Sequence, residues 1–224
     1  MFSRHDLAWL SARGWERACA VAPSASRATI GGWGAAGWPA VVTRTHAGLA
    51  PGQVALGIAL PPRLDGSKPR IGIEADRADI LRTTGAMQLA DAISAAPPGW
   101  RAALAMLDHE AAGAGLALRV YGSLAFQALT GQAYLTAGSD IDLLLHPATT
   151  AHYHCALDLL LHHAGVLPLD GELVFGGAQG VAWKELATCP TGQARVLAKS
   201  LHGAALVTVD RLLASLGEEF PCTA

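Results

Sequence analysis

The sequence predicts an α+β fold in which a small β-rich N-terminal part precedes a domain with a small mixed sheet flanked by helices. Up to about residue 75, short β-like runs alternate with Gly and Pro, as in Gly31-Gly32-Trp33-Gly34, and such breakers are typical of turns between strands. From residue 116 on, strand-like and helix-like segments alternate, which favours a sheet covered by helices. A chain of 224 residues is long enough for two such parts. We therefore expect domains at 1–76 and 77–224.

The elements of the first domain and of the start of the second follow from local patterns. Three β-rich runs are expected to form strands: 40–43, 54–60 and 70–73. Asp6 is placed to cap a helix over 7–13. The second domain is expected to begin with a helix over 78–95, which Pro97-Pro98-Gly99 ends, and to continue with a helix over 100–114 that has one apolar face.

The rest of the second domain reads as alternating strands and helices. The expected strands are 116–121, 139–146 and 167–175, the last interrupted at Gly171. Gly122 and Ser123 form a tight turn before a short helix over 124–129. A longer helix follows, capped by Thr149 or Thr150 and ended by Gly165, with its apolar stripe at Tyr153, Ala156, Leu157, Leu160, Leu161 and Ala164. Strand or helix is expected at 181–186 and 195–200, and helix at 209–216.

Composition and charge exclude several classes of protein. Hydrophobic residues make up 51 % and charged residues 15 %, well below the roughly 25 % charge of an average soluble protein, so the chain is not disordered. A net charge of −2 lacks the cationic surplus that binding a long nucleic acid requires. No apolar stretch approaches the roughly 20 residues that span a bilayer. The cysteines are dispersed without a Cys-x-x-Cys pair, which indicates reduced thiols and a cytoplasmic protein: Cys19, Cys155, Cys189 and Cys222.

Two aspartates on one expected strand indicate a metal site. Side chains alternate along a strand, so Asp140 and Asp142 point to one side and Ile141 and Leu143 to the other. Two adjacent like charges on one face repel each other and oppose folding. A divalent cation would neutralise them, and carboxylate oxygens suit Mg²⁺. The simpler alternative is that Asp140 ends a turn after Ser139 and that Asp142 lies on an exposed edge.

The Gly122-Ser123 turn strengthens the functional interpretation. Gly122 allows the backbone to approach a ligand closely, and the following amides, the Ser123 hydroxyl and a helix N-terminus can bind phosphate oxygens. An ordinary strand-to-helix turn would look the same in isolation. Followed by Gly138-Ser139-Asp140-Ile141-Asp142 on an apolar strand, it resembles the signature of the DNA-polymerase-β-like nucleotidyltransferase superfamily.

Further segments narrow the resemblance, which spans essentially the whole chain. Six of them occur in a characteristic order: Arg4-His5-Asp6-Leu7, Gly57-Ile58-Ala59-Leu60-Pro61, Val120-Tyr121-Gly122-Ser123, Ser139-Asp140-Ile141-Asp142-Leu143, Val181-Ala182-Trp183-Lys184-Glu185 and Val196-Leu197-Ala198-Lys199. Together they resemble the malonate decarboxylase holo-[acyl-carrier-protein] synthase family, the phosphoribosyl-dephospho-CoA transferases. Where many nucleotidyltransferases have a basic residue and a Gly after Gly-Ser, this chain has Leu124-Ala125-Phe126, which argues against a simple nucleoside triphosphate as substrate.

The resemblance implies a specific reaction. The donor would be 2′-(5″-triphosphoribosyl)-3′-dephospho-CoA, and the acceptor a serine of the malonate decarboxylase acyl-carrier subunit, with release of pyrophosphate. Two Mg²⁺ ions would be held by Asp140, Asp142 and a third carboxylate, and Gly122 and Ser123 would receive the pyrophosphate end. Either Asp142 or the third carboxylate would accept the serine proton.

The third carboxylate is expected to be Glu172. Continuous β residues follow Glu172, whereas Gly171 would disturb Asp170; Asp170 has the same strand parity and remains the alternative. Lys184 and Lys199 are candidates to neutralise phosphate, and Lys184 is the preferred one. Three cations around a Pro-rich loop are candidates to contact the CoA end of the donor or the carrier: Arg63, Lys68 and Arg70.

Four histidines are not expected to bind metal, because they lie off the apolar stripe of their helix: His152, His154, His162 and His163. Two other functions remain compatible with the sequence. One is a nucleotidyltransferase that adenylylates a protein or small molecule from ATP, and the other is a non-catalytic module that binds a carrier protein. The intact Asp140, Asp142 and Gly122-Ser123 weigh against the second.

Overall fold

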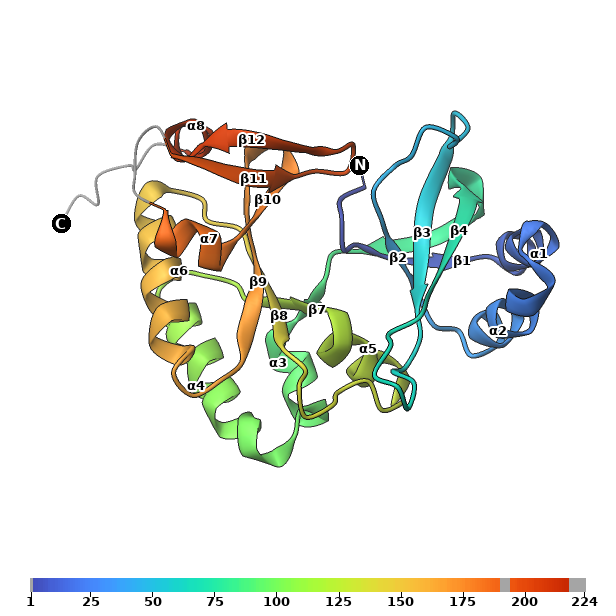
Figure 1. Cartoon of the computed structure of the whole chain (residues 1–224), viewed down its shortest axis with the longest axis horizontal. Helices are drawn as coiled ribbons and strands as arrows, with labels where there is room; N and C mark the ends of the chain where they lie inside the picture. Colours follow the sequence, from blue (N-terminus) through green and yellow to red (C-terminus); the bar gives the residue numbers. More distant parts are fainter. Residues whose placement is uncertain (1, 190–193, 218–224) are drawn as a thin grey trace.

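The chain forms two β-sheets that lie side by side, each with its own helices (Figure 1). The structure is a computed structural model and describes residues 2–189 and 194–217, so Cys222 lies outside the described residues. The first sheet has the strand order β4-β3-β2-β1-β5 and the second β12-β11-β10-β9-β8-β7-β6. The mixed α+β class expected from the sequence is confirmed.

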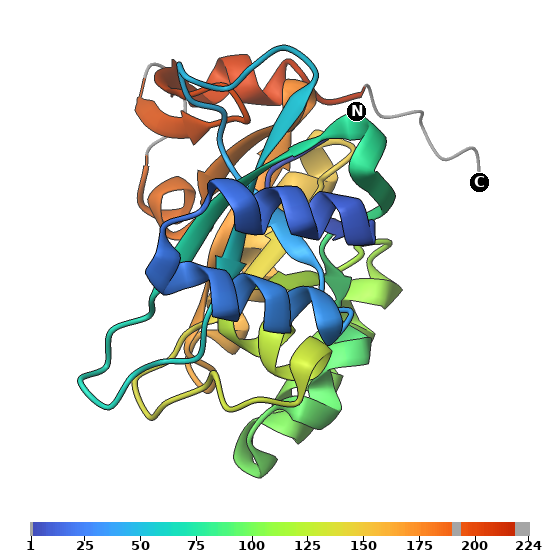
Figure 2. The same cartoon turned by 90° about the vertical axis from the view of Figure 1, so that its right-hand side faces the viewer.

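The first sheet is antiparallel and is covered on one side by two helices. Its strands are β1 (Leu7–Leu10), β2 (Ala40–Val42), β3 (Gln53–Ala59), β4 (Arg70–Asp76) and β5 (Ile80–Thr84). The helices are α1 (Ala12–Val21) and α2 (Ser24–Ala35), which lie on the outer side of the molecule (Figure 2). Buried Trp15 and Trp33 belong to the core between the helices and the sheet.

The prediction of a helix over residues 7–13 is wrong, because residues 7–10 form strand β1. Leu7 pairs with Val41 on one side and Thr84 on the other, so these sheet contacts override local helix propensity. Helix α1 begins later, where the Ser11 side chain accepts a hydrogen bond from the amide of Gly14. Helix α2 was missed because glycines weaken the helical signal. At Gly34, however, a Cβ would lie 2.6 Å from Trp15 Cγ, so glycine allows the two helices to pack closely.

The helix expected over residues 78–95 is also largely wrong. The segment contains a short 3-10 helix η1 (Arg77–Asp79), then β5 and β6 (Met87–Gln88), and only then α3 (Leu89–Ala92) and η2 (Ile93–Ala95). Strand β5 fills the free edge of β1, and β6 pairs with β7. The first sheet therefore extends to Thr84, past the boundary expected at residue 76.

The second sheet is mixed, and helices cover the face that carries the largest core. Its remaining strands are β7 (Arg119–Tyr121), β8 (Ile141–Leu145), β9 (Leu169–Phe175), β10 (Gln179–Ala182), β11 (Arg195–Lys199) and β12 (Ala204–Thr208). Its helices are α4 (Pro98–Gly113), α5 (Gly122–Thr130), α6 (Thr150–His163), α7 (Trp183–Thr188) and α8 (Val209–Leu213). Among the strands of the described residues, β8 and β9 are the one neighbouring pair that runs parallel, and α6 is the crossover between them.

Helix α6 corrects part of the predicted apolar stripe. Thr149 caps the helix by accepting a hydrogen bond from the amide of His152. Leu161, which was expected to be buried, is 53 % exposed. His163 is buried instead, and its Nε2 lies within hydrogen-bond distance of Glu110 Oε2 on α4, at 3.0 Å.

The two sheets share core residues, which fixes the first domain against the second. Phe126 and Tyr134 follow β7 in sequence, yet they pack in the hydrophobic cluster of the first sheet with Trp33. Tyr134 Oη also donates a 2.8 Å hydrogen bond to the carbonyl of Ala59 at the end of β3. Within the described part of the chain, no helix has the length and apolar character needed to cross a membrane.

Candidate active site

Two aspartates lie opposite each other on the parallel strands β8 and β9. In the register of these strands Asp142 pairs with Asp170, and on the other side of β8 Asp142 pairs with Tyr121 of β7. Residues directly opposite on neighbouring strands point to the same face. That face is the one away from Ile141 and Leu143, which are fully buried in the core. We call Asp142 and Asp170 the carboxylate pair; exposed Asp140 precedes β8 immediately beside them.

The carboxylate pair brings two acidic groups close together, with few cations near them. Burial, followed by the nearby charge of Asp170, raises the pKa of Asp142 to about 6, while Lys68 and Arg70 oppose this shift. The cation nearest to Asp170 is Lys184 on α7, with 3.9 Å between its Nζ and Asp170 Oδ1. The structure thus places Lys184, expected to bind phosphate, beside the carboxylate pair.

Gly122 brings the start of α5 into direct contact with Asp142. Helix α5 begins at Gly122 itself, so the separate turn expected before residue 124 is already the first turn of the helix. Gly122 has a φ of 66°, and a Cβ there would lie 2.1 Å from Asp142 Oδ2. Only glycine permits both the backbone conformation and the close approach. Ser123 follows, and its Oγ accepts a 3.2 Å hydrogen bond from Lys68 Nζ.

We expect Gly122→Ala to abolish activity without unfolding the protein. The added methyl would displace the Asp142 carboxylate and would also be strained at positive φ. Turnover should fall by at least about 100-fold, on the scale expected when a catalytic group is displaced by about 1 Å, whereas circular dichroism should match that of the wild type. Gly131→Ala is the matched control, because Gly131 also has a φ of 70° but has open space around it. Equal losses in the two variants would show that backbone strain, not the contact with Asp142, is responsible.

Glu172 lies on the same face but is engaged with cations rather than with the aspartates. Its side chain is buried, with Arg4 Nη1 at 3.0 Å from Oε2 and Lys199 Nζ at 3.2 Å from Oε1. Although burial opposes ionisation, His5 and Arg4 lower the pKa of Glu172 to about 2. A Cβ at Gly180 would lie 2.3 Å from Glu172 Oε2, so glycine makes room for this cluster. The structure therefore does not bring Glu172 together with Asp140 and Asp142, as was expected for a third metal ligand.

The strand β9 is continuous through Gly171, contrary to the interruption expected there. Gly171 has a φ of 127°, and a Cβ would lie 1.9 Å from the carbonyl oxygen of Leu143. The glycine thus lets β9 approach β8 closely at the level of the carboxylate pair. The amide of Gly171 also donates a 2.8 Å hydrogen bond to Asp170 Oδ1, which orients Asp170 instead of disturbing it.

His5 is a residue near the site that the sequence reasoning did not select. Its backbone has a φ of 71°, a conformation that is uncommon for a residue other than glycine and that concentrates at functional sites. Its ring stacks on Tyr121 with 3.9 Å between ring centroids, and its Nε2 lies 3.7 Å from Glu172 Oε2. The signal in the sequence was the Arg4-His5-Asp6-Leu7 segment; its proximity to β7 and β9 depends on the fold.

The donor set fits divalent cations in chemical type. Carboxylate oxygens are the ligands that Mg²⁺ prefers. The pKa of Asp142 is raised by burial and then by the charge of Asp170, and a bound cation would oppose both effects. Across residues 2–189 and 194–217, no group of three or more His, Cys, Asp or Glu side chains is already arranged around one ion position. A metal ion held by Asp140 and the carboxylate pair would therefore require their side chains to rearrange around it.

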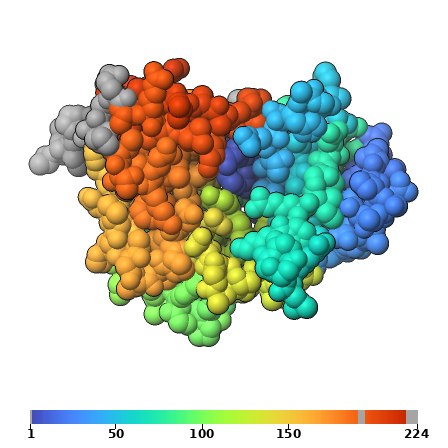
Figure 3. Space-filling model, viewed as in Figure 1, coloured from blue at the N-terminus to red at the C-terminus, as the bar shows by residue number. Residues whose placement is uncertain are grey.

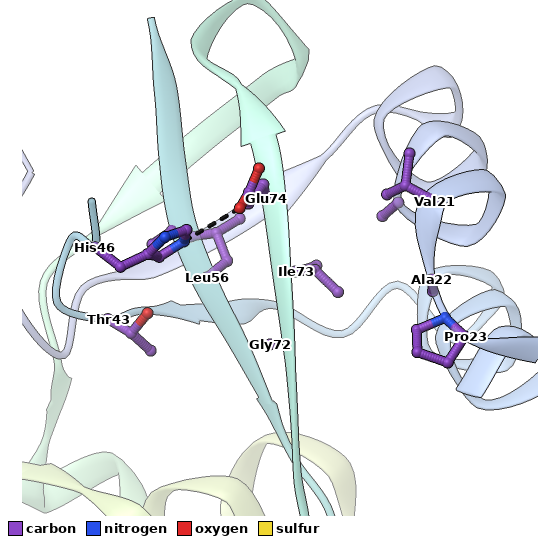
Figure 4. A pocket seen from close by; sticks show the side chains of 11 residues that line it. Val21, Ala22, Pro23, Thr43, His46, Leu56, Gly72, Ile73 and Glu74 are labelled. Atoms are coloured by element: carbon purple, nitrogen blue, oxygen red, sulfur yellow. Dashed lines mark ion pairs between the residues drawn. The ribbon is translucent and has the colours of Figure 1, made fainter. Parts of the chain in front are cut away.

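The cavities of the molecule do not all belong to this site. A cavity of about 200 Å³ adjoins it and is lined by Arg4, His5, His146 and Glu172 among others. A larger one of about 460 Å³ lies in the first domain, between the connection of α1 to α2 and the sheet. Figure 4 shows the residues that line this cavity, with an ion pair between His46 and Glu74, whose atoms lie 3.1 Å apart. That cavity is lined entirely by residues of the first domain and contains no residue of the carboxylate pair.

Comparison with known proteins gives a consistent match over both domains. The family model described as phosphoribosyl-dephospho-CoA transferase MdcG N-terminal domain matches residues 3–86, and the corresponding C-terminal domain model matches residues 88–210. A phosphoribosyl-dephospho-CoA transferase of Xanthomonas campestris pv. campestris (strain 8004) is 42 % identical over 189 residues, which cover 84 % of this chain and 86 % of the relative. Another from Bradyrhizobium diazoefficiens is 32 % identical over 211 residues, covering 93 % and 90 %. No solved structure matches the chain.

Proposed function

Because the chain belongs to the phosphoribosyl-dephospho-CoA transferase family, and is therefore a transferase, we propose that it attaches a prosthetic group to a carrier protein. The donor is 2′-(5″-triphosphoribosyl)-3′-dephospho-CoA, the acceptor is a serine of the malonate decarboxylase acyl-carrier subunit, and pyrophosphate is released. We place this reaction in the cytoplasm. The observation that carries the proposal is the contact between Gly122, at the start of α5, and Asp142 of the carboxylate pair.

Three aspartates would hold the metal ions in this proposal: Asp140, Asp142 and Asp170. Asp170 replaces Glu172 as third ligand because it lies opposite Asp142 in the register of β8 and β9, whereas Glu172 is already paired with Arg4 and Lys199. Two Mg²⁺ ions bound there would supply charge stabilisation for both the attacking and the leaving oxygen of an in-line displacement. Lys184, close to Asp170, would add a positive charge at the same edge.

Other residues of the chain would bind the leaving pyrophosphate and accept the serine proton. The serine oxygen of the carrier forms a bond to the phosphorus next to the ribose, and the bond from that phosphorus to the pyrophosphate oxygen breaks. The first amides of α5 and the Ser123 hydroxyl face the leaving pyrophosphate, where a helix N-terminus favours negative charge. Asp142 accepts the serine proton, because it is the carboxylate in contact with the start of α5, whereas Glu172 is already paired with Arg4 and Lys199.

The direct experiment is transfer to the purified apo carrier subunit, followed by intact mass. With Mg²⁺ and the triphosphoribosyl-dephospho-CoA donor, we expect one serine of the carrier to gain the mass of one phosphoribosyl-dephospho-CoA group, and EDTA should stop the reaction. ATP should not label the carrier, because it lacks the remote parts of the donor whose binding positions the reacting groups. EDTA-sensitive adenylylation from ATP without transfer from the CoA-type donor would instead establish an adenylylating nucleotidyltransferase. Absence of both reactions, with carrier binding retained, would establish a non-catalytic binding module.

A further inference from the structure

A hairpin of the first domain reaches the candidate active site of the second. It connects β3 to β4 through residues 60–69 and extends away from the first sheet to the side of α5 (Figure 1). The view turned by 90° again shows the hairpin beside the chain that follows α5 (Figure 2). In the space-filling view its teal atoms contact the yellow surface of the second domain (Figure 3). The hairpin is thus a part of the first domain that borders on the site.

The hairpin is anchored at its base and ordered at its tip. At the base, the amide of Leu60 donates to the carbonyl of Pro69 at 3.0 Å, and Tyr134 of the second domain donates to the carbonyl of Ala59. At the tip, the amide of Ser67 donates a 2.8 Å hydrogen bond to Asp65 Oδ1, and the amide of Arg63 donates to the carbonyl of Ser67 at 2.9 Å. These bonds hold the segment in one place relative to α5.

Lys68 is the residue that this hairpin directs at the site. Its Nζ donates to Ser123 Oγ at 3.2 Å, and its charge lowers the pKa of Asp142 against the effect of burial. Among the residues that the structure describes, Lys68 forms no ion pair with a carboxylate. Its ammonium group therefore has hydrogen-bond donors left for another acceptor, since a lysine carries three.

Stability alone gives little reason for this placement. An exposed hydrogen bond between a lysine and a serine contributes only about 1 kcal/mol or less, and it orders a long flexible side chain. The tip of the hairpin has no packing function either, because Leu64 is fully exposed. An unpaired cation beside the first turn of α5 instead suits an anionic ligand that touches both.

Building on the proposed function, we infer that Lys68 binds the phosphate chain of the donor, so that the active site is composed from both domains. Lys68 comes from the hairpin and reaches the first turn of α5 at Ser123, where the amides of Gly122 and Ser123 begin the helix, so a phosphate chain bound at this turn would contact both. The first domain thus contributes directly to donor binding. The ligand chemistry is a linear polyphosphate, which inorganic tripolyphosphate reproduces without the CoA portion.

The test measures tripolyphosphate binding and donor kinetics on the full-length protein. For Lys68→Gln we expect binding of Mg²⁺-tripolyphosphate, measured by calorimetry, to weaken at least tenfold, and KM for the donor to rise by a similar factor with a smaller change in kcat. Lys68→Arg should restore most of the affinity, because it keeps the charge. Arg63→Gln is the matched control for tripolyphosphate binding, since Arg63 is an exposed cation of the same hairpin and tripolyphosphate lacks the CoA portion that Arg63 is a candidate to contact. Its affinity for Mg²⁺-tripolyphosphate should match that of the wild type.

The outcomes separate this inference from the proposed function. If the wild type transfers the group but Lys68→Gln keeps its KM and its affinity for tripolyphosphate, the role of Lys68 is overturned and the function stands. If the wild type modifies no carrier, but Lys68→Gln binds tripolyphosphate more weakly than the wild type does, the proposed function fails. Lys68 is then a phosphate-binding residue of another reaction. Equal weakening in Lys68→Gln and Arg63→Gln, or no tripolyphosphate binding by the wild type at millimolar concentration, also overturns the inference.

Discussion

Asp142→Asn is expected to abolish transfer while leaving the fold intact, with turnover reduced by at least about 1,000-fold, on the scale of removing a group that acts in the transition state. Asparagine keeps the volume of the side chain and its contact with Gly122 but removes the negative charge that a cation and a serine proton both require. Asp140→Asn should also lose nearly all activity, because the proposed metal site requires the negative charge of this carboxylate. Turnover above a tenth of the wild-type value in both variants would contradict the metal-site assignment.

The Asp142→Asn variant should be more stable than the wild type when no divalent metal is present. Burial and Asp170 raise the pKa of Asp142 to about 6 in the folded protein from an ordinary 3.8. The folded state therefore binds this proton more tightly than the unfolded state, so wild-type stability is lost as the pH rises from about 4 through about 6. The free-energy difference is on the order of 1–3 kcal/mol. Chemical denaturation at pH 4 and pH 7.5 with EDTA measures it, and Asp142→Asn should gain relative to the wild type only at the higher pH.

The sequence was sufficient for the features of the site that depend on local patterns. Alternation along a strand places Asp142 on the face of β8 opposite Ile141 and Leu143, and a helix directly after β7 was expected from the Gly122-Ser123 segment. The first domain was predicted less well because its elements depend on distant partners. Strand β1 is a strand because β2 and β5 flank it, and α2 tolerates its glycines because Trp15 packs against Gly34.

The choice between Asp170 and Glu172 could not be made from strand parity, which is the same for both. The proposal of Asp170 rests on register, since β8 and β9 pair Asp142 with Asp170 and Leu144 with Glu172. It also rests on the N-terminal segment, which brings Arg4 to Glu172 across 168 positions of sequence. Neither pairing leaves a local signal in the sequence, and the same holds for the contact of His5 with Tyr121.

Asp170→Asn and Glu172→Gln are therefore expected to differ in kind. Asp170→Asn should lower turnover at least about 100-fold, as removal of one charged group from a catalytic electrostatic site does. Its melting temperature without metal should be equal to or above that of the wild type, because a repulsion with Asp142 is relieved. Glu172→Gln should act mainly on stability, because it leaves Arg4 and Lys199 without their carboxylate. Removing one partner of a buried ion pair costs on the order of 3 kcal/mol, which lowers the melting temperature of a chain of this size by roughly 6–12 °C.

A double-variant cycle distinguishes this structural role of Glu172 from metal binding. Arg4→Met combined with Glu172→Gln removes both members of the pair, so the double variant should lose less stability than the two single changes added together. At a temperature where Glu172→Gln is fully folded, its turnover should stay well above that of Asp170→Asn, and its dependence on Mg²⁺ concentration should match that of the wild type. A Glu172→Gln protein that melts as the wild type does, but needs far more Mg²⁺ or is inactive, would return the role of third ligand to Glu172. The comparison depends on geometry that the register of β8 and β9 fixes, because the carboxylate two pairs further along the strands contacts Arg4 and Lys199 instead of lying opposite Asp142.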